Sequence, residues 1–224
     1  MKRYLPFVIV VGVALVTFGS GTILYRAKLP QVKNIPEGQS IPPGTAADSA
    51  HIRGNPDAPV TLEEFGDFQC PPCGQFAAFV HELLKEYDSR LRVVFRNFPL
   101  PAHKHAQEAA QAAEAAGLQG KFWEMYDTLY REQALWSEAS NARGLFESYA
   151  GAIGLDVDQF KKDMDSDKVR ERIDSDHALA ESLGVKVTPT LFINNRAIEP
   201  YEKNPEGVRA AINEALEAKS KNGS

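Results

Sequence analysis

The sequence has only two cysteines among its 224 residues, and it has neither a nucleotide-binding glycine loop nor an internal repeat. Cys70 and Cys73 are separated by two residues, and a disulfide that closes so short a loop restricts the unfolded chain little. A structural cross-link is therefore a poor explanation of the pair. Two cysteines at redox spacing, with no others to mispair, favour an oxidising compartment.

The sequence also lacks an excess of positive charge. Its formal net charge is −5 at pH 7, and residues 1–28 hold four basic residues and no acidic one, so the remainder carries 21 basic and 30 acidic residues. This acidic balance indicates a solvated surface and argues against a nucleic-acid partner. A hydrophobic content of 43% supports a real core, and the length allows one large soluble domain or two small ones.

Charge is absent from the N-terminal segment between Tyr4 and Tyr25. Within it, Leu5 to Leu24 gives 20 mainly apolar residues, about the length that spans a bilayer core. We therefore expect residues 1–27 to be a membrane anchor, with the N-terminus inside. A cleaved signal peptide is the alternative, although the apolar region of such a peptide normally has only about 7–15 residues.

A stretch rich in proline and glycine, without sustained periodicity, follows at residues 28–50 and is predicted to be a tether. The folded domain is predicted to span residues 51–224. Its first clear strand is expected over residues 60–68, and a second over residues 91–98 ends at prolines. A helix lies between them, and strand, helix, strand is typical of a parallel unit.

The cysteine pair lies where the first strand turns into this helix. Pro71 pushes Cys70 out of the helical region, so the helix is predicted to begin near Pro72, with Cys73 one turn inside. Unpaired N–H groups and the positive end of the helix dipole favour a thiolate over a thiol, which makes Cys70 the expected nucleophile. The spacing brings the sulfurs close enough for an exchangeable disulfide.

The middle of the chain has a helical pattern without a convincing strand. Helices are expected over residues 105–116 (ended by Gly117), 121–136, 144–153, 156–164 (capped by Asp156) and 165–183. A strand over residues 186–193, a turn at Asn194-Asn195 and a short edge strand at 196–198 are expected next. The last helix is predicted from Pro205, with Asn204 as its cap, to Ala218.

Two motifs resemble the DsbA-like branch of the thioredoxin superfamily: Glu64-Phe-Gly-Asp-Phe-Gln-Cys-Pro-Pro-Cys73 early in the chain and Val187-Thr-Pro-Thr-Leu-Phe-Ile-Asn194 late in it. The segments 95–100 and 120–125 are also similar to this branch. The resemblance implies an α/β thioredoxin fold, with a mixed central sheet flanked by helices and an inserted all-helical subdomain at about residues 102–165. With the predicted anchor, one N-terminal transmembrane helix would precede this fold.

The resemblance also implies thiol–disulfide exchange on secreted proteins. By position, Cys70 matches the attacking cysteine and Cys73 the resolving one. Glu64 matches a buried acid that relays a proton for the resolving thiol. Glu63 competes for that place, because only one of two neighbours on a strand can face inward, and a surface position for Glu64 is the alternative.

The late motif supplies the other side of the expected site. Pro189 matches a cis-proline that faces the active site, and Thr188 would offer backbone hydrogen bonds to a bound substrate strand. The dipeptide Pro71-Pro72 departs from the strongest oxidases of the branch, whose dipeptide includes a histidine that can donate to the thiolate. Both prolines lack an N–H group, so we expect a Cys70 pKa that is lowered less than in those oxidases, and a less oxidising potential.

A metal site is the rival interpretation of the cysteines, because His103 and His105 could supply further ligands. We expect no metal, since no second cysteine pair exists and structural zinc usually takes four protein ligands. Both histidines are expected to be solvated at the exposed start of a helix. Four aromatic residues are expected in the core, with a peptide groove as the alternative: Phe122, Trp123, Tyr126 and Trp136.

The expected function is that of a monomeric thiol–disulfide oxidoreductase, anchored in a membrane, with its domain in the periplasm or on the outer face of the cytoplasmic membrane. Its redox-active disulfide Cys70–Cys73 would need no other cofactor. It would donate this disulfide to unfolded or thiol-containing secreted or membrane proteins and be reoxidised by a DsbB-like membrane partner. A reductase served by a reducing partner, or an isomerase, would use the same residues, and a non-catalytic binding or metal-handling module is the second class. We favour the oxidase, since no added dimerisation segment of the isomerase kind is evident.

Overall fold

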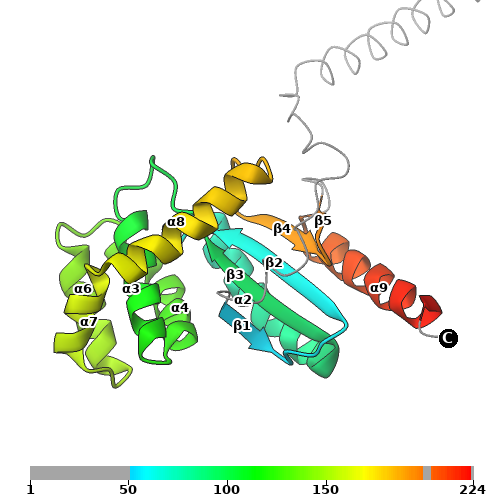
Figure 1. Ribbon diagram of the computed structural model, residues 1–224, viewed down its shortest axis with the longest axis horizontal. Helices are drawn as coiled ribbons and strands as arrows, with labels where there is room; N and C mark the ends of the chain where they lie inside the picture. Colours follow the sequence, from blue (N-terminus) through cyan, green and yellow to red (C-terminus); the bar gives the residue numbers. More distant parts are fainter. Residues whose placement is uncertain (1–50, 199–202, 223–224) are drawn as a thin grey trace, which may run out of the picture. The chain divides into compact units, whose positions relative to one another are not determined.

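The computed structural model describes residues 51–198 and 203–222 (Figure 1). These residues belong to the second of two compact units, residues 35–224. The predicted anchor and tether, residues 1–50, lie outside the described residues. Across the described ranges, no helix is both long enough and apolar enough to cross a membrane.

A five-stranded mixed sheet forms the centre of the described domain, in the order β1-β3-β2-β4-β5. Only β2 and β3 run parallel, and every other neighbouring pair is antiparallel. The strands are β1 (His51–Gly54), β2 (Val60–Gly66), β3 (Leu91–Asn97), β4 (Thr190–Ile193) and β5 (Arg196–Ala197). The mixed sheet and the parallel unit agree with the sequence prediction. The edge strand β1 was not predicted, because its four residues owe their extended form to pairing with β3.

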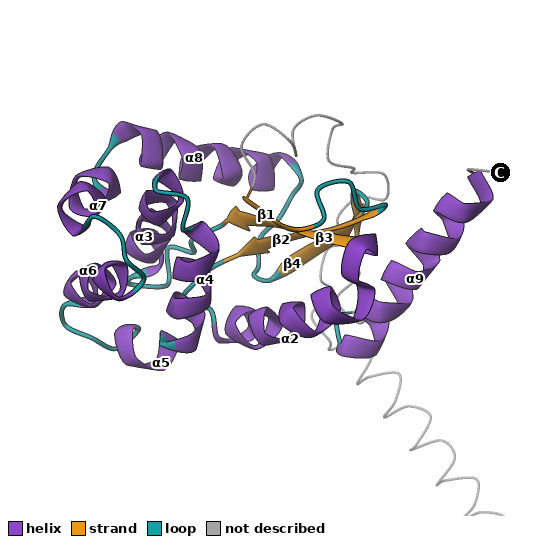
Figure 2. Ribbon diagram, turned by 90° about the horizontal axis from the view of Figure 1, so that it is seen from below, coloured by secondary structure: helices purple, strands orange, loops and turns teal. Residues whose placement is uncertain are grey.

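Helices surround the sheet and fill the interval between β3 and β4. Their bounds are α2 (Pro71–Tyr87), α3 (Ala106–Leu118), α4 (Phe122–Arg131), α5 (Gln133–Trp136), α6 (Ala142–Ala152), α7 (Val157–Met164), α8 (Asp167–Ser182) and α9 (Pro205–Asn222), with a short 3₁₀ helix η1 (Asp88–Arg90) after α2. Figure 2 shows α2 and α8 on opposite faces of the sheet, and α3 to α7 gathered at one end of it.

Both faces of β2 and β3 are therefore buried. Val60 and Leu62 pack with side chains of α2 and α9 on one face. On the other face, Phe65 packs with Ala180 near the end of α8 and with Leu183, which follows this helix. Successive side chains of a strand point to opposite faces of the sheet, so a strand covered on both faces can bury two neighbouring polar side chains. Two neighbouring glutamates at the candidate site are buried in this way.

Several helix limits match the predicted caps. Asp156 accepts a hydrogen bond from the Gln159 N–H at 3.0 Å, and Asn204 accepts one from the Gly207 N–H at 2.9 Å. Each satisfies a backbone donor that the first helical turn leaves free. Local polar residues at these positions were enough to predict where the helices begin.

Four predicted limits were wrong. The last helix, expected to end at Ala218, continues to Asn222. Gly117 lies within α3, which ends at Leu118, and the left-handed residue that follows is Gly120, with φ +75°. The helix expected over residues 121–136 is divided into α4 and α5 at Glu132. The strand expected over residues 186–193 begins only at Thr190, because Pro189 has no N–H group to offer a sheet.

Candidate active site

The two cysteines lie at the start of α2, directly after the loop that leaves β2. Cys70 is the N-terminal cap, with extended backbone angles of φ −77° and ψ 118°, and its carbonyl accepts from the Gly74 N–H at 3.2 Å. The helix begins at Pro71, one residue earlier than predicted, since the missing N–H of proline costs nothing in the first turn. Cys70 keeps 5% of its surface exposed and Cys73 none, so of the two only Cys70 can meet a reagent from solvent.

The two thiols have opposite acidities. A hydrogen bond from the Cys73 thiol is the main reason that the pKa of Cys70 falls to about 6 from an ordinary 9.0. The Thr188 side chain and the Cys73 N–H add to the lowering, although among the described residues the Thr188 hydroxyl has no partner at hydrogen-bond geometry. Burial opposes this effect, and so does the charge of Asp67. The pKa of Cys73 is raised, mainly by burial and then by Cys70 and Glu64. The cysteine that keeps some surface exposed is therefore the one that ionises, as a nucleophile requires.

The segment around Thr188 and Pro189 lies beside the cysteines, although more than a hundred residues separate them in the chain. The Thr188–Pro189 peptide bond is cis, the geometry that the resemblance implied. The Cys70 thiol donates to the Thr188 carbonyl at 3.4 Å, and the Lys203 ammonium group donates to the Pro189 carbonyl at 2.9 Å. The structure thus brings together Cys70, Cys73, Thr188 and Pro189, as the sequence analysis expected.

Glu64 is fully buried on the α2 face of the sheet, which rules out the surface position considered for it. Burial is the main cause that raises its pKa from 4.5 to about 8, and the charge of Cys70 adds to the effect. The Tyr126 hydroxyl lowers the pKa, yet among the described residues neither carboxyl oxygen has a partner at hydrogen-bond geometry. A carboxyl group with such a pKa can hold or release a proton near neutral pH.

Glu63 is also buried, so the expectation that only one of the two glutamates could face inward was wrong. Its carboxylate accepts from the Arg96 side chain at 2.7 Å, and Arg96 also donates to Asp176 of α8 at 3.0 Å. These groups lie on the α8 face, opposite Glu64. Glu63 and Glu64 do point to opposite faces of the sheet, as neighbours on a strand must. Both are buried because helices cover both faces.

The helices between β3 and β4 hold the loop before α2 through side chains that the sequence analysis did not single out. The Gln133 side chain of α5 donates to the Phe68 carbonyl at 2.6 Å and to the Cys70 carbonyl at 3.0 Å. Gln69 donates to the Ser137 carbonyl at 3.2 Å and accepts from the backbone N–H of residue 105 at 2.6 Å. The sequence does not indicate which backbone groups Gln69 and Gln133 will bond, because only folding brings these distant segments together.

The two histidines differ from expectation. His105 is buried, and its ring lies 3.0 Å from the Ala139 carbonyl through Nε2. His103 keeps 26% of its side chain exposed, and its Nδ1 lies 2.7 Å from Oδ2 of the buried Asp67. Each ring nitrogen in these contacts meets a protein oxygen instead of solvent. In the described part of the chain, no group of three or more histidine, cysteine or acidic side chains is arranged to hold a metal ion.

The four aromatic residues expected in the core lie there or against it. Phe122, Tyr126 and Trp136 are buried, while Trp123 is partly buried and its indole N–H donates to the Ile52 carbonyl at 2.9 Å. A different set of side chains lines a groove beside Pro189, with a volume of about 420 Å³. Its apolar walls come from α2, from β4 and the segment before it, and from α9, and they include Phe76, Phe79, Val187, Leu191 and Val208.

A mixed sheet in this order, with a Cys-x-x-Cys pair at the start of a helix and a cis-proline opposite, defines a thioredoxin-like domain. The chain belongs to the thioredoxin family, since the family model described as thioredoxin matches residues 46–214.

Solved structures add that the domain is strongly similar to DsbA-type oxidoreductases. BdbD from Bacillus subtilis superposes with a TM-score of 0.68 at 23% identity, covering 75% of this chain and 94% of that one. A thioredoxin-like oxidoreductase from Silicibacter pomeroyi gives 0.65 at 28% identity, with 77% and 95% covered. Alpha-DsbA1 from Wolbachia pipientis gives 0.65 at 22% identity, with 77% and 94% covered.

Curated relatives are longer proteins. The chain is 42% identical over 151 residues to a Mycolicibacterium gilvum protein named Na(+)/H(+) antiporter NhaA 1, and the match covers 65% of this chain and 23% of that protein. The chain therefore spans about a quarter of the length of the curated relatives it matches.

Proposed function

We propose that the chain is a thiol–disulfide oxidoreductase that oxidises thiols of secreted or membrane proteins with its Cys70–Cys73 disulfide. The observation that carries this proposal is the pairing of one acidic thiol that keeps a small exposed surface with one fully buried, weakly acidic thiol at the start of α2, opposite Thr188 and cis-Pro189. A structural cysteine pair has no need of such unequal acidities. The redox-active disulfide is the only redox group that the proposal requires.

The exchange proceeds in two displacements. A substrate thiolate attacks the Cys70 sulfur, forms a mixed disulfide and expels the Cys73 sulfur, which takes up a proton. A second substrate thiolate then attacks the substrate sulfur of the mixed disulfide and releases Cys70 as a thiolate. The substrate loses two electrons and two protons, and the cysteine pair gains the two electrons. The low pKa of Cys70 suits a leaving group, and the high pKa of Cys73 explains why its departure calls for a proton donor.

Glu64 is our candidate for that donor. Its pKa of about 8 keeps it largely protonated at neutral pH, and its charge, when it ionises, raises the pKa of Cys73. Thr188 and Pro189 are the proposed substrate-binding residues, and the neighbouring groove would receive the polypeptide around the reacting cysteine. Among the described residues, the most exposed large apolar residues are Leu135 at 58% and Val187 at 57%, and Val187 belongs to this groove. Such surfaces suit an unfolded polypeptide.

Location and partners complete the proposal. The uncharged segment between Tyr4 and Tyr25 would anchor the protein in the cytoplasmic membrane, with the domain as a monomer on the outer or periplasmic side. A DsbB-like membrane protein would reoxidise the cysteine pair after each cycle. Nucleic acid is not a proposed partner, because the domain is acidic.

Trapping of mixed disulfides tests the exchange directly. Cys73→Ser removes the internal thiol that can attack the mixed disulfide and reverse the first displacement, so adducts between Cys70 and substrate proteins should persist. We expect reductant-sensitive, high-mass adducts on non-reducing gels of cells that produce this variant. The matched control is Cys70→Ser, which keeps the buried cysteine and should trap no adducts. Equal absence of adducts in both variants would favour a non-catalytic binding module.

The direction of exchange depends on the potential of the cysteine pair. Pro71 and Pro72 offer no N–H groups to the Cys70 sulfur, so Pro72→His should stabilise the thiolate and make the disulfide more oxidising by roughly 30 mV or more, about tenfold in the equilibrium constant. Equilibration with glutathione measures this change, and Pro72→Ala restores an N–H without an imidazole. A histidine variant no more oxidising than wild type would refute the explanation. A mostly reduced pair in the cell would point to a reductase or isomerase.

A further inference from the structure

Asp67 is a buried carboxylate in the loop that carries the candidate nucleophile, three residues before it. The side chain is 1% exposed, and its backbone carbonyl accepts from the Cys70 N–H at 3.0 Å. Three donors converge on its carboxyl oxygens: the N–H groups of Gln69 at 2.7 Å and Leu100 at 2.9 Å, and the ring of His103 at 2.7 Å. Of these donors only His103 can change its charge.

The negative charge of Asp67 acts on Cys70. The pKa of Cys70 is lowered overall, chiefly by the Cys73 thiol, but Asp67 is the carboxylate whose charge opposes that lowering. A group that neutralises Asp67 would therefore favour the Cys70 thiolate.

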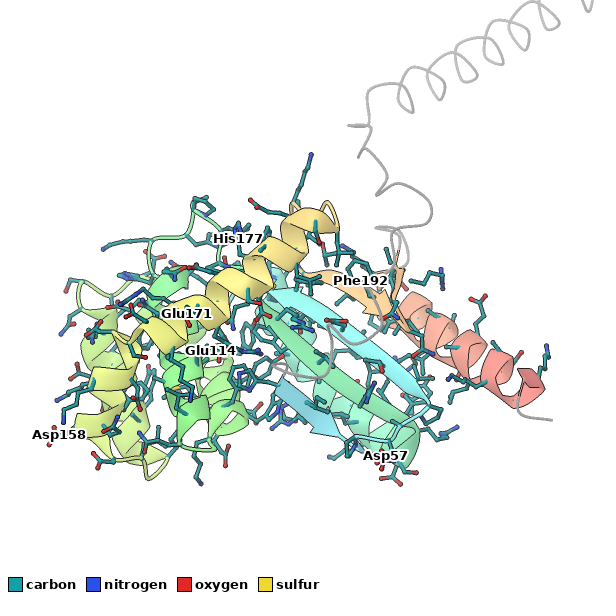
Figure 3. The ribbon with its side chains drawn as sticks, in the orientation of Figure 1. Asp57, Glu114, Asp158, Glu171, His177 and Phe192 are labelled. Carbon is teal, nitrogen blue, oxygen red and sulfur yellow. The ribbon has the colours of Figure 1, made fainter. Side chains whose placement is uncertain are left out.

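His103 lies between Asp67 and solvent. It lines an open cavity of about 430 Å³, to which the other contributors include Gln107 of α3 and Asp174 and His177 of α8. Figure 3 labels His177 on this helix, and its ring packs against Phe98 with centroids 4.9 Å apart. A histidine that is exposed on one side and bonded to a buried carboxylate on the other can pass a change in proton concentration inward.

We propose that His103 is a positioning residue for the thiol chemistry: its proton compensates Asp67 and thereby favours the ionised form of Cys70. When both ring nitrogens of His103 carry a proton, the ring and the Asp67 carboxylate have no net charge together, and the thiolate is favoured. When the ring is neutral, one negative charge remains three residues from Cys70, and the thiolate is disfavoured. Among the described residues, the titratable groups around this path are Asp174 and His177 in the cavity, Tyr130 of α4, whose hydroxyl donates to the Asp67 carbonyl at 3.4 Å, and Glu64 and Cys73, which interact with Cys70.

This proposal rests on the proposed function only where it concerns the rate of disulfide exchange. The ionisation of Cys70 itself can be measured without any substrate protein. His103→Asn keeps a donor but removes the charge, and the rate of iodoacetamide labelling of Cys70 at pH 6 should fall by about twofold, with the rate profile displaced to higher pH. His177→Asn is the matched control, since that ring lines the same cavity without touching Asp67, and it should label like wild type.

A double-variant cycle separates this role from simple packing. Asp67→Asn should speed labelling at pH 6, and adding His103→Asn to it should change nothing further, because the carboxylate on which the histidine acts is gone. Unfolding curves establish that each variant is folded. A wild-type profile in His103→Asn, or an equal effect of that change in both backgrounds, would overturn the proposal.

A second measurement needs no variant. Because linkage is reciprocal, a thiolate that is favoured by a proton on His103 must in turn favour that proton. An NMR titration of the His103 ring should therefore have its midpoint at higher pH in the reduced protein than in the oxidised protein. Identical midpoints in the two redox forms would also refute the proposal, whether or not the protein exchanges disulfides.

Discussion

At pH 7 the reduced protein is expected to react with iodoacetamide at Cys70 and to leave Cys73 unmodified. A thiol with a pKa of about 6 is mostly ionised at this pH, whereas one at the ordinary 9.0 is ionised in about one molecule in a hundred. The pKa of Cys73 is raised further by burial, and none of its surface is exposed. Labelling should therefore be at least about a hundredfold faster at Cys70.

Mass spectrometry of labelled peptides measures this difference, and the rise in thiolate absorbance near pH 6 gives the midpoint. In Cys70→Ser the remaining thiol should stay unreactive until the protein is unfolded. Cys73→Ala should move the Cys70 midpoint to higher pH, because the Cys73 thiol is the main group that lowers the Cys70 pKa. Comparable labelling of both cysteines in the folded protein would contradict the unequal acidities on which the proposed mechanism depends.

Replacing Glu64 with glutamine is expected to raise the free energy of unfolding of the oxidised protein at pH 7 by about 2–3 kcal/mol. The unfolded chain loses this proton near pH 4.5, whereas the folded, reduced protein keeps it up to about pH 8. Burial is the main cause and persists in the oxidised protein, although the smaller contribution of the Cys70 charge does not. Between these two values the folded state holds the extra proton, so its stability falls as the pH rises. A neutral glutamine does not pay this cost.

The measurement is urea unfolding of the disulfide form at several pH values. The oxidised protein is the better choice, because in the reduced protein the lowered pKa of Cys70 acts in the opposite direction, adding stability as the pH rises from about 6 toward 9. The wild-type stability should decline from pH 5 to pH 8, and Glu64→Gln should remove most of that decline. If the variant is no more stable than wild type at pH 7, then Glu64 is not the buried, proton-holding group described above.

The adjacent glutamate supplies a control of opposite sign. Glu63 accepts a hydrogen bond from the buried Arg96, so Glu63→Gln leaves part of a buried charge uncompensated. This change should destabilise the protein by about 2 kcal/mol, less than complete loss of a buried ion pair, because Asp176 still accepts from Arg96. Opposite effects of the same substitution at neighbouring positions would show that the two faces of β2 have different environments.

Much of the fold could be predicted from local features of the chain. The prolines after Cys70 marked the start of α2 to within one residue, and the capping residues Asp156 and Asn204 marked the starts of α7 and α9. These features act through backbone donors within one helical turn, so they need no knowledge of distant residues. The limits that failed, at Gly117 and around Glu132, depend on how α3 and α4 pack and end within the domain.

The candidate site was predictable only in part. The Cys-x-x-Cys pair and the Thr188-Pro189 motif were visible in the sequence, and the resemblance placed them in one site. No local pattern indicated that the Gln133 side chain would donate to the Cys70 carbonyl, or that the His103 ring would contact Asp67. Such contacts join loops that are distant in the chain, and residue type alone does not specify a partner.

The sequence by itself determined which cysteine begins the helix, since a proline restricts the residue before it and its own missing N–H is harmless in the first turn. Only the tertiary structure decided the acidity of that cysteine and the roles open to its neighbours. Burial raises the pKa of Glu64 and Cys73, a carbonyl from a distant loop meets the Cys70 thiol, and two helices on opposite faces of β2 give Glu63 and Glu64 different interiors. The physical reason is that backbone preferences act over a few residues, whereas solvation and charge depend on everything that packing brings within a few ångströms.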